Sequence, residues 1–214
     1  MKVFLLHAMP LDERMWKPQL EALAGQDVEA PNLYDLGGAS VDTWAEALLA
    51  STEDDAAVVG ASMGGYVGLA MAREAPERVL GLLLVGSRVG ADTPERRAVR
   101  DGQIRTLQEE GIGAWAPSAP APPPPERTVD ELVRAVQALR DRSDSTELAQ
   151  SFQGPLWIAV GDADPFFPAD EAREIVEAAP NGRLEVFEDT GHFPTRDQPE
   201  RFNELLREFL QAAA

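Results

Sequence analysis

The sequence predicts an α/β fold: a trimmed, mostly parallel sheet of six strands with helices on both faces. Six short apolar segments alternate with segments whose apolar residues recur at helical spacing. Most of the apolar segments are continuous rather than alternating, which is typical of parallel strands that helices cover on both sides. The chain of 214 residues shows no break in composition, so we expect one domain over residues 1–214.

The six predicted strands are the apolar segments themselves. Their alternation with helices along the chain favours strands that all run in the same direction. The predicted strands are KVFLLH (2–7), DVEAPNL (27–33), AAVVGAS (56–62), VLGLLLVGS (79–87), PLWIAVGD (155–162) and RLEVFED (183–189).

Five predicted helices lie between or after these strands. In each, the apolar residues fall on one face of a 3.6-residue period, and that face is expected to pack on the sheet. The predicted helices are MWKPQLEALAG (15–25), VDTWAEALLAS (41–51), YVGLAMAREAP (66–76), PADEAREIVEAAP (168–180) and PERFNELLREFLQAA (199–213).

The alternation is interrupted between about residues 88 and 151, where we expect a small helical cap inserted over the sheet. Two segments, 94–110 and 129–142, have the pattern of amphipathic helices. Between them lies WAPSAPAPPPP (115–125), whose prolines exclude a helix or a central strand. This segment predicts an extended, semi-rigid connector.

The charge balance excludes several classes of partner. The chain has 37 acidic and 19 basic side chains and a net charge of −18, which opposes binding to nucleic acid or to an anionic membrane. Residues 88–142 differ, because their nine arginines balance nine acidic side chains. Two interpretations of this neutral segment stay open: solvated helix faces with paired charges, or a cap that tolerates anionic substrates.

Cysteine is absent, and the only histidines are His7 and His192. Thiolate chemistry and disulfides are therefore excluded, and no metal site is expected, because it would have to rely mostly on carboxylates. The N-terminal apolar segment is short, has no small-residue cleavage pattern and meets charged residues from Asp12 onward, so it does not predict a signal peptide. No segment approaches the roughly 18 apolar residues of a membrane span. We expect a cytoplasmic protein.

The segment GASMGG, residues 60–65, places Ser62 between small residues at the junction of a predicted strand and a predicted helix. A G-x-S-x-G pattern alone is weak evidence, because it also arises by chance. In a nucleophile elbow, however, the serine occupies a strained strand-to-helix turn, and small neighbours let the two backbones approach. The context makes Ser62 a candidate nucleophile.

A serine hydroxyl needs a base, and the base needs an acid that orients it. Only His192 follows Ser62 in the chain, and it lies in the loop after the last strand, at the carboxyl edge of the sheet. The acid is expected after the preceding strand, where two aspartates compete. Asp162 leaves the strand directly and could tie down the turn, whereas Asp164 lies two residues further out. Spacing alone leaves both open.

These motifs resemble those of the α/β-hydrolase family, particularly its esterase, lactonase and enol-lactonase members. The resemblance covers most of the chain. LLHAMPLDERMWKPQLEAL resembles the family's LLHG stretch and first helix, GASMGG its nucleophile elbow, GDADPFFP its acid loop G-x-x-D-x-x-x-P, and TGHFP its histidine loop. Four motifs in the family's order are highly specific together.

The resemblance implies a role for each matching residue. Ser62 would be the nucleophile, His192 the general base and then the general acid, and Asp164, as the aspartate of G-x-x-D, the orienting acid. The backbone N–H groups of Met9 and Met63 would form an oxyanion hole. His7 would then hold the loop that carries Met9.

The chain departs from the family's pattern in two ways. Ala8 stands where relatives usually carry glycine, so a positive φ at this position would strain the loop by about 1 kcal/mol. Relatives usually begin with two further strands, whereas the first predicted strand here starts at Lys2. This second difference is the reason for expecting a trimmed sheet.

Aromatic residues beside these motifs are candidates for a substrate pocket. Trp115 begins the proline-rich connector of the cap, and Phe166 and Phe193 stand next to the acid and histidine motifs. The competing interpretation for each of them is an ordinary place in the core.

The sequence therefore predicts a serine hydrolase that acts on a small-molecule carboxylic ester or lactone through an acyl-enzyme, without a cofactor or metal. Two alternatives stay open. One is an acyltransferase that uses the same three residues with an acceptor other than water. The other is a non-catalytic protein that binds a small ligand on the same fold.

Overall fold

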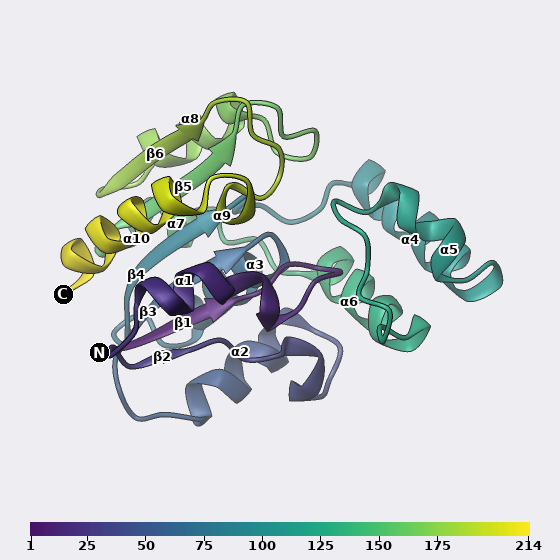
Figure 1. Cartoon of the computed structure of the whole chain (residues 1–214), viewed down its shortest axis with the longest axis horizontal. Helices are drawn as coiled ribbons and strands as arrows, with labels where there is room; N and C mark the ends of the chain where they lie inside the picture. Colours follow the sequence, from purple (N-terminus) through teal and green to yellow (C-terminus); the bar gives the residue numbers. More distant parts are fainter.

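One sheet of six strands runs through the molecule (Figure 1). The computed structural model describes residues 1–214, and its strands are ordered β2-β1-β3-β4-β5-β6 with every neighbouring pair parallel. The strands are β1 (Lys2–Leu6), β2 (Val28–Glu29), β3 (Ala56–Ala61), β4 (Val79–Val85), β5 (Leu156–Gly161) and β6 (Gly182–Phe187). The predicted α/β fold with six parallel strands is confirmed.

Strand β2 is shorter than the segment predicted for it. The prediction covered residues 27–33, but only Val28 and Glu29 pair with β1. Pro31 has no N–H to donate to a strand ladder. Immediately after it, the side chain of Asn32 accepts a hydrogen bond from the Tyr34 N–H and begins a 3-10 helix.

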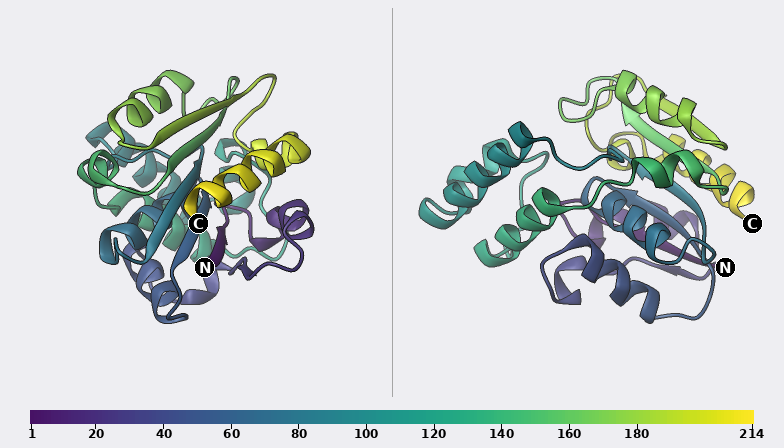
Figure 2. Two further views of the ribbon diagram at one scale, coloured as in Figure 1. Left: turned by 90° about the vertical axis from the view of Figure 1, so that its left-hand side faces the viewer. Right: turned by 180° about the vertical axis from the view of Figure 1, so that it is seen from behind.

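Helices cover both faces of the sheet (Figure 2, left). α1 and α10 lie on one face, and α2, α3 and α8 lie on the other. The bounds are α1 (Lys17–Ala22), α2 (Val41–Ala50), α3 (Met63–Glu74), α8 (Ala169–Ala178), α9 (Pro194–Asp197) and α10 (Pro199–Ala213), with 3-10 helices at Glu13–Trp16 and Leu33–Leu36. None of the helices combines the length and the apolar character that crossing a membrane requires.

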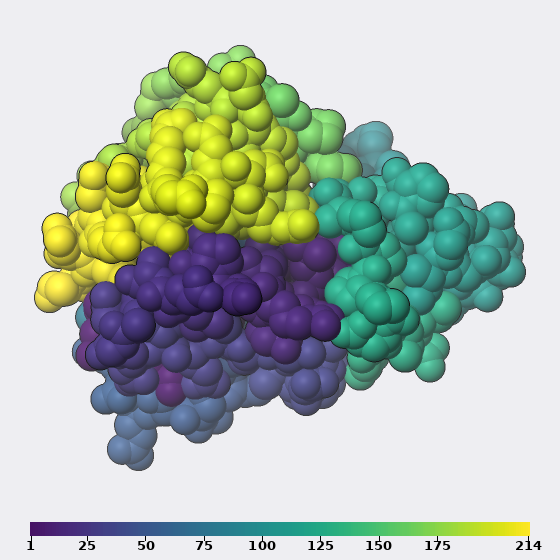
Figure 3. Space-filling view, viewed as in Figure 1, coloured from purple at the N-terminus to yellow at the C-terminus, as the bar shows by residue number.

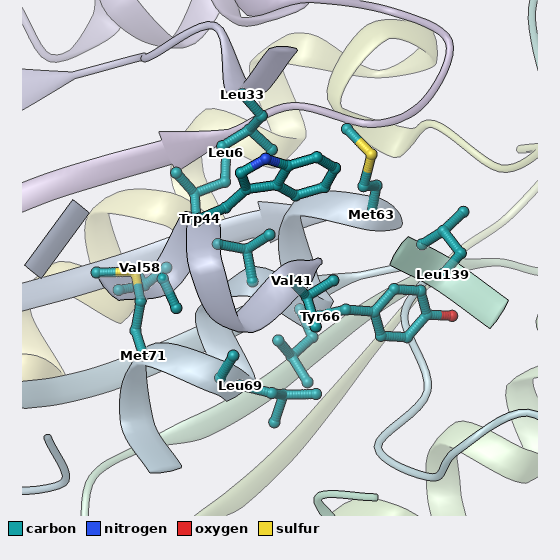
Figure 4. Close-up of a cluster of buried hydrophobic side chains, with 14 of the residues drawn as sticks. Leu6, Leu33, Val41, Trp44, Val58, Met63, Tyr66, Leu69, Met71 and Leu139 are labelled. Carbon is teal, nitrogen blue, oxygen red and sulfur yellow. The ribbon is translucent and has the colours of Figure 1, made fainter. Parts of the chain in front are cut away.

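Consecutive residues of a strand belong to different halves of the core. Val58 packs with α2, α3 and α8 in one apolar cluster, and Val59 packs with Trp16 and α10 in a second cluster. Because side chains alternate across a strand, a strand that is buried on both faces is apolar at every position. This explains the continuous apolar segments of the sequence. Figure 4 shows part of the first cluster, in which Trp44 lies near Leu6 and Leu33, and Tyr66 lies near Leu139 of the cap.

The predicted insertion forms a helical cap beyond the carboxyl ends of the strands (Figures 1 and 3). It comprises α4 (Pro94–Glu109), α5 (Ile112–Trp115), a 3-10 helix (Ala116–Ser118) and α6 (Val129–Asp141), and α4 packs on α6. Local capping sets where these helices begin. Thr93 accepts the Arg96 N–H, and Thr128 forms a reciprocal capping box with Glu131.

Two details of the insertion differ from the prediction. The segment Trp115–Ser118 was expected to be extended, but it is helical, because Pro117 occupies the first turn of a 3-10 helix, where its missing N–H is not needed. The insertion was also expected to continue to residue 151. Helix α7 (Thr146–Ser151) instead packs on α3 and α8, with Ala149 in the first core cluster.

Candidate active site

Four loops that follow strands meet at the carboxyl edge of the sheet. They come after β3, β4, β5 and β6 and carry Ser62, Gly86, Asp164 and His192. Parallel strands place their carboxyl ends at one edge, so residues far apart in the chain become neighbours there.

Ser62 forms the sharp turn between β3 and α3. Its backbone angles, φ 47° and ψ −105°, belong to a region that costs a non-glycine residue about 1–3 kcal/mol. Hydrogen bonds hold the turn: the Ser62 N–H donates to the Val85 carbonyl at 2.7 Å, and the Ser62 carbonyl accepts from the Gly65 N–H and the Ser87 hydroxyl. The strained strand-to-helix turn predicted here is present, with Ser62 half-buried at its apex.

The glycines around Ser62 let backbone segments touch. A Cβ on Gly60 would collide with the backbone of Gly64, and a Cβ on Gly64 would collide with the Leu6 carbonyl. A Cβ on Gly65 would meet the Ser87 side chain. The small residues predicted to be necessary at this turn are therefore required by contact with β1, β3 and the loop after β4.

His192 and Asp164 form a buried pair. His192 Nδ1 lies 2.7 Å from Asp164 Oδ2, and the two side chains are 5% and 0% exposed. The other carboxylate oxygen, Oδ1, accepts the N–H groups of Phe166 at 2.8 Å and Phe167 at 3.2 Å. These bonds orient the carboxylate, which in turn favours the proton on Nδ1 and leaves Nε2 as an acceptor. The His192 ring bonds only to Asp164, and no hydrogen bond joins it to the Ser62 hydroxyl.

Asp162 has a different partner. Its Oδ1 accepts the Thr190 N–H at 3.2 Å, and its side chain is exposed. The structure thus brings Asp164, rather than Asp162, to His192. Asp162 instead fastens the start of the loop that carries His192.

Gly86 is a neighbour of the pair that sequence reasoning missed. Its φ is +62°, and a Cβ at this position would lie 2.8 Å from His192 Cε1 and 3.4 Å from Asp164 Oδ2. Any side chain would therefore displace the ring or the carboxylate. The only signal in the sequence was a glycine near the end of the predicted strand 79–87.

Two backbone N–H groups beside Ser62 are available to bind an anion. Met63 is the first residue of α3, where a helix leaves the N–H without an acceptor of its own. The Met9 N–H takes part in none of the hydrogen bonds of the loop after β1. Ala8, between His7 and Met9, does not have a positive φ, so the strain considered for an alanine at that position is absent.

His7 fastens the loop that carries Met9. Its Nε2 accepts the Leu33 N–H at 2.9 Å, and its Nδ1 lies 3.1 Å from the Ala8 carbonyl. Both bonds are satisfied only by a neutral ring with the proton on Nδ1. Tyr34 stacks on His7 at 5.2 Å, and Arg127 of the cap lies over the Tyr34 ring at 3.9 Å. The loop is therefore packed against the cap as well as against the sheet.

Lowering the pH from 7 to 4.5 is expected to destabilise the protein through His7. Burial lowers the pKa of His7 from 6.5 to about 4, so between these values the unfolded chain binds a proton that the folded chain does not. The free energy of unfolding is thus undiminished above pH 6.5 and falls as the pH drops, by about 3 kcal/mol near pH 4. Urea unfolding at pH 7.5, 6, 5 and 4.5 measures this loss.

The matched control is His7→Asn, which is less stable at every pH but lacks the titrating ring. Its stability should depend less on pH over the same interval. Equal slopes in the two proteins would assign the pH dependence to other groups.

A cavity of about 490 Å³ opens beside Ser62 between the sheet and the cap. Met9, Ser62 and His192 line it from the sheet side, and Trp115 lines it from the cap. Phe166 also lines it and meets the His192 ring edge-on at 5.1 Å.

Three predicted site residues, Asp164, Phe193 and Met63, do not line the cavity. Phe193 packs edge-on to the His192 ring at 4.9 Å and belongs to the second core cluster, on the other face of the sheet. The Met63 side chain is fully buried in the first cluster, as Figure 4 shows, so only its backbone is relevant to the site.

Comparison with known proteins gives one consistent family. A model described as alpha/beta hydrolase family matches residues 3–205. Among curated proteins, the pimeloyl-[acyl-carrier protein] methyl ester esterase of Aromatoleum aromaticum is 25% identical, and the match covers 97% of each chain.

Solved structures agree with this match. A thermophilic esterase from Thermogutta terrifontis is 27% identical, with a TM-score of 0.88 over 100% of this chain and 90% of the other. The enol-lactonase from Burkholderia xenovorans LB400 is 19% identical, with a TM-score of 0.81 over 98% of this chain and 91% of the other, and it shares the fold.

Proposed function

The chain belongs to the alpha/beta hydrolase family, and we propose that it is a serine hydrolase that cleaves a small carboxylic ester or lactone. One observation carries the proposal: His192, hydrogen-bonded to the buried Asp164, lines the same cavity as Ser62, which occupies a strained turn at its edge. The esterases among the similar proteins support hydrolysis as the class of reaction.

In the proposed first step, Ser62 Oγ attacks the carbonyl carbon of the substrate and its proton passes to His192 Nε2. Asp164 accepts the Nδ1–H hydrogen bond and stabilises the imidazolium that forms. The negative charge on the substrate oxygen faces the N–H groups of Met9 and Met63. Each such donor lowers the barrier by about 3 kcal/mol, because it is already oriented toward the developing charge.

The tetrahedral intermediate then collapses. The bond from carbon to the leaving oxygen breaks, the leaving oxygen takes the proton from His192 Nε2, and the acyl group stays on Ser62. Water attacks the acyl-enzyme, gives a proton to His192 and releases the acid, while Ser62 regains its proton. In a lactone the leaving hydroxyl remains attached to the acyl chain.

A fluorophosphonate probe is expected to label Ser62 and no other residue. Only a hydroxyl that is activated by a base, beside donors that stabilise the phosphorus oxygen, attacks the probe quickly. Intact mass and peptide mapping after a short incubation identify the labelled residue. Ser62→Ala should prevent labelling and ester hydrolysis together.

The matched control is Ser118→Ala. Ser118 also lines the cavity, but its hydroxyl donates to the Trp115 carbonyl at 2.8 Å. Labelling should persist in this variant. If folded wild-type protein is never labelled yet binds a small ester saturably, the chain is a binding protein on this fold.

A further inference from the structure

The cavity beside Ser62 has a positively charged lining in a strongly acidic protein. It contains three arginines, Arg88, Arg96 and Arg100, and one acidic side chain, Asp92, whereas the whole chain has a net charge of −18. Arg96 and Arg100 lie in α4 of the cap, Asp92 lies just before α4, and Arg88 lies in the loop after β4. The local charge therefore favours an anion where the overall charge opposes one.

Asp92 is already neutralised by its neighbours. Its carboxylate pairs with Arg142 at 2.7 Å and with Arg100 at 3.3 Å, and its side chain is 2% exposed. Because the Asp92 carboxylate is buried and forms ion pairs with two guanidinium groups, it repels an incoming anion only weakly. Glu171, which pairs with Arg88 and Arg96, does not line the cavity, so the lining itself keeps an excess of positive charge.

Arg96 and Arg100 have guanidinium N–H groups that donate to no protein acceptor. They are one turn apart on α4, so both side chains point to the same side of the helix. The Arg96 guanidinium donates no hydrogen bond and has only a loose ion pair with Glu171 at 3.8 Å. Arg100 uses Nε for Asp92 and one terminal nitrogen for Gln103, which leaves its other terminal nitrogen free.

Arg88 is engaged in the structure of the loops. Its guanidinium pairs with Glu171 at 2.7 Å, donates to the Phe166 carbonyl and lies 5.2 Å from the centre of the Phe167 ring. It braces the acid loop after β5. The groups that remain for a ligand are those of Arg96 and Arg100.

We propose that the substrate carries a carboxylate at the end of its acyl part and that Arg96 and Arg100 bind this carboxylate. The inference rests on the proposed function, since it needs the scissile carbonyl at Ser62. Ser62 lines the cavity from the sheet and the two arginines line it from the cap, so a substrate attacked at Ser62 extends toward them. Guanidinium groups bind carboxylates through short, charge-assisted hydrogen bonds. A hemiester of a short dicarboxylic acid is the simplest such compound.

The test compares monomethyl glutarate with methyl valerate, two methyl esters with five-carbon acyl chains that differ only in the terminal carboxylate. Wild-type kcat/KM should be about tenfold or more higher for monomethyl glutarate. Arg96→Gln and Arg100→Gln should each lower the ratio of the two kcat/KM values by about tenfold. We expect Arg96→Gln to fold like wild type, because the Arg96 side chain donates no hydrogen bond and has only one long ion pair, with Glu171. Arg105→Gln, an exposed arginine on the same helix, should leave the ratio as in wild type.

Measuring the binding of glutarate tests the carboxylate site separately from the proposed hydrolase activity. Glutarate should bind to Ser62→Ala by calorimetry, and adding Arg100→Gln should abolish that binding. Labelling of Ser62 by the fluorophosphonate together with equal ratios in all variants would overturn the carboxylate site alone. Absence of labelling together with arginine-dependent glutarate binding would overturn the hydrolase and keep the site.

Discussion

The Asp164→Asn variant is expected to fold and to lose about 10⁴-fold in kcat. An asparagine oxygen can still accept the N–H groups of Phe166 and Phe167, so the acid loop keeps its shape. The amide nitrogen would then face His192 Nδ1 as a donor. Nδ1 must accept that hydrogen bond, which moves the ring proton to Nε2, and a protonated Nε2 cannot take the proton of Ser62. Steady-state kinetics with a short-chain ester and the melting temperature measure the two effects.

Asp162→Asn is the matched control, because it makes the same chemical change two residues earlier. Its oxygen can still accept the Thr190 N–H, and the side chain is exposed. Most of the activity should remain, with a loss of stability of about 1 kcal/mol or less. The reverse pattern, an active Asp164→Asn and an inactive Asp162→Asn, would transfer the orienting role to Asp162.

Arg142→Met is expected to lower the free energy of unfolding by about 3–5 kcal/mol. Arg142 pairs with Asp92 at 2.7 Å, and both side chains are 2% exposed. It also donates to the Leu139 and Gly90 carbonyls and lies 4.2 Å from the centre of the Tyr66 ring. Removing the guanidinium leaves a buried carboxylate and the carbonyls of Leu139 and Gly90 with fewer partners. Methionine fills the space of the chain but supplies no donor.

Urea unfolding of Arg142→Met against Arg140→Met tests this expectation. Arg140 lies in the last turn of α6, two residues before Arg142, and has two ion pairs, with Asp101 and Asp141, but it is 25% exposed. Its loss should cost less than about 1 kcal/mol, since water screens and replaces exposed ion pairs. Equal losses in the two variants would show that burial of the Asp92 pair does not matter.

The sequence predicted the elements well where the signal was local. Each strand buried on both faces is apolar throughout, as Val58 and Val59 illustrate, and GASMGG carries the glycines that the turn at Ser62 needs. Two elements were predicted less well, because the apolar pattern of β2 is short and because the prolines of the connector were taken to exclude a helix over its whole length. β2 has only two paired residues, and Trp115–Ser118 is helical although it contains Pro117 and further prolines follow it.

The order of strands and helices, the strained turn at Ser62 and the family were thus determined by the sequence itself, because periodicity and turn chemistry act over a few neighbouring residues. Spacing alone left two aspartates open and the family resemblance pointed to Asp164, and the structure places that carboxylate against His192. Only the tertiary structure decided why no side chain fits at Gly86 and which arginines of the cap line the cavity. These are contacts through space: Asp164 and His192 are 28 residues apart, and Arg100 reaches the cavity from a helix inserted after β4. Spacing along one chain does not specify such contacts, since they depend on how β4, β5, β6 and the cap pack at one edge of the sheet.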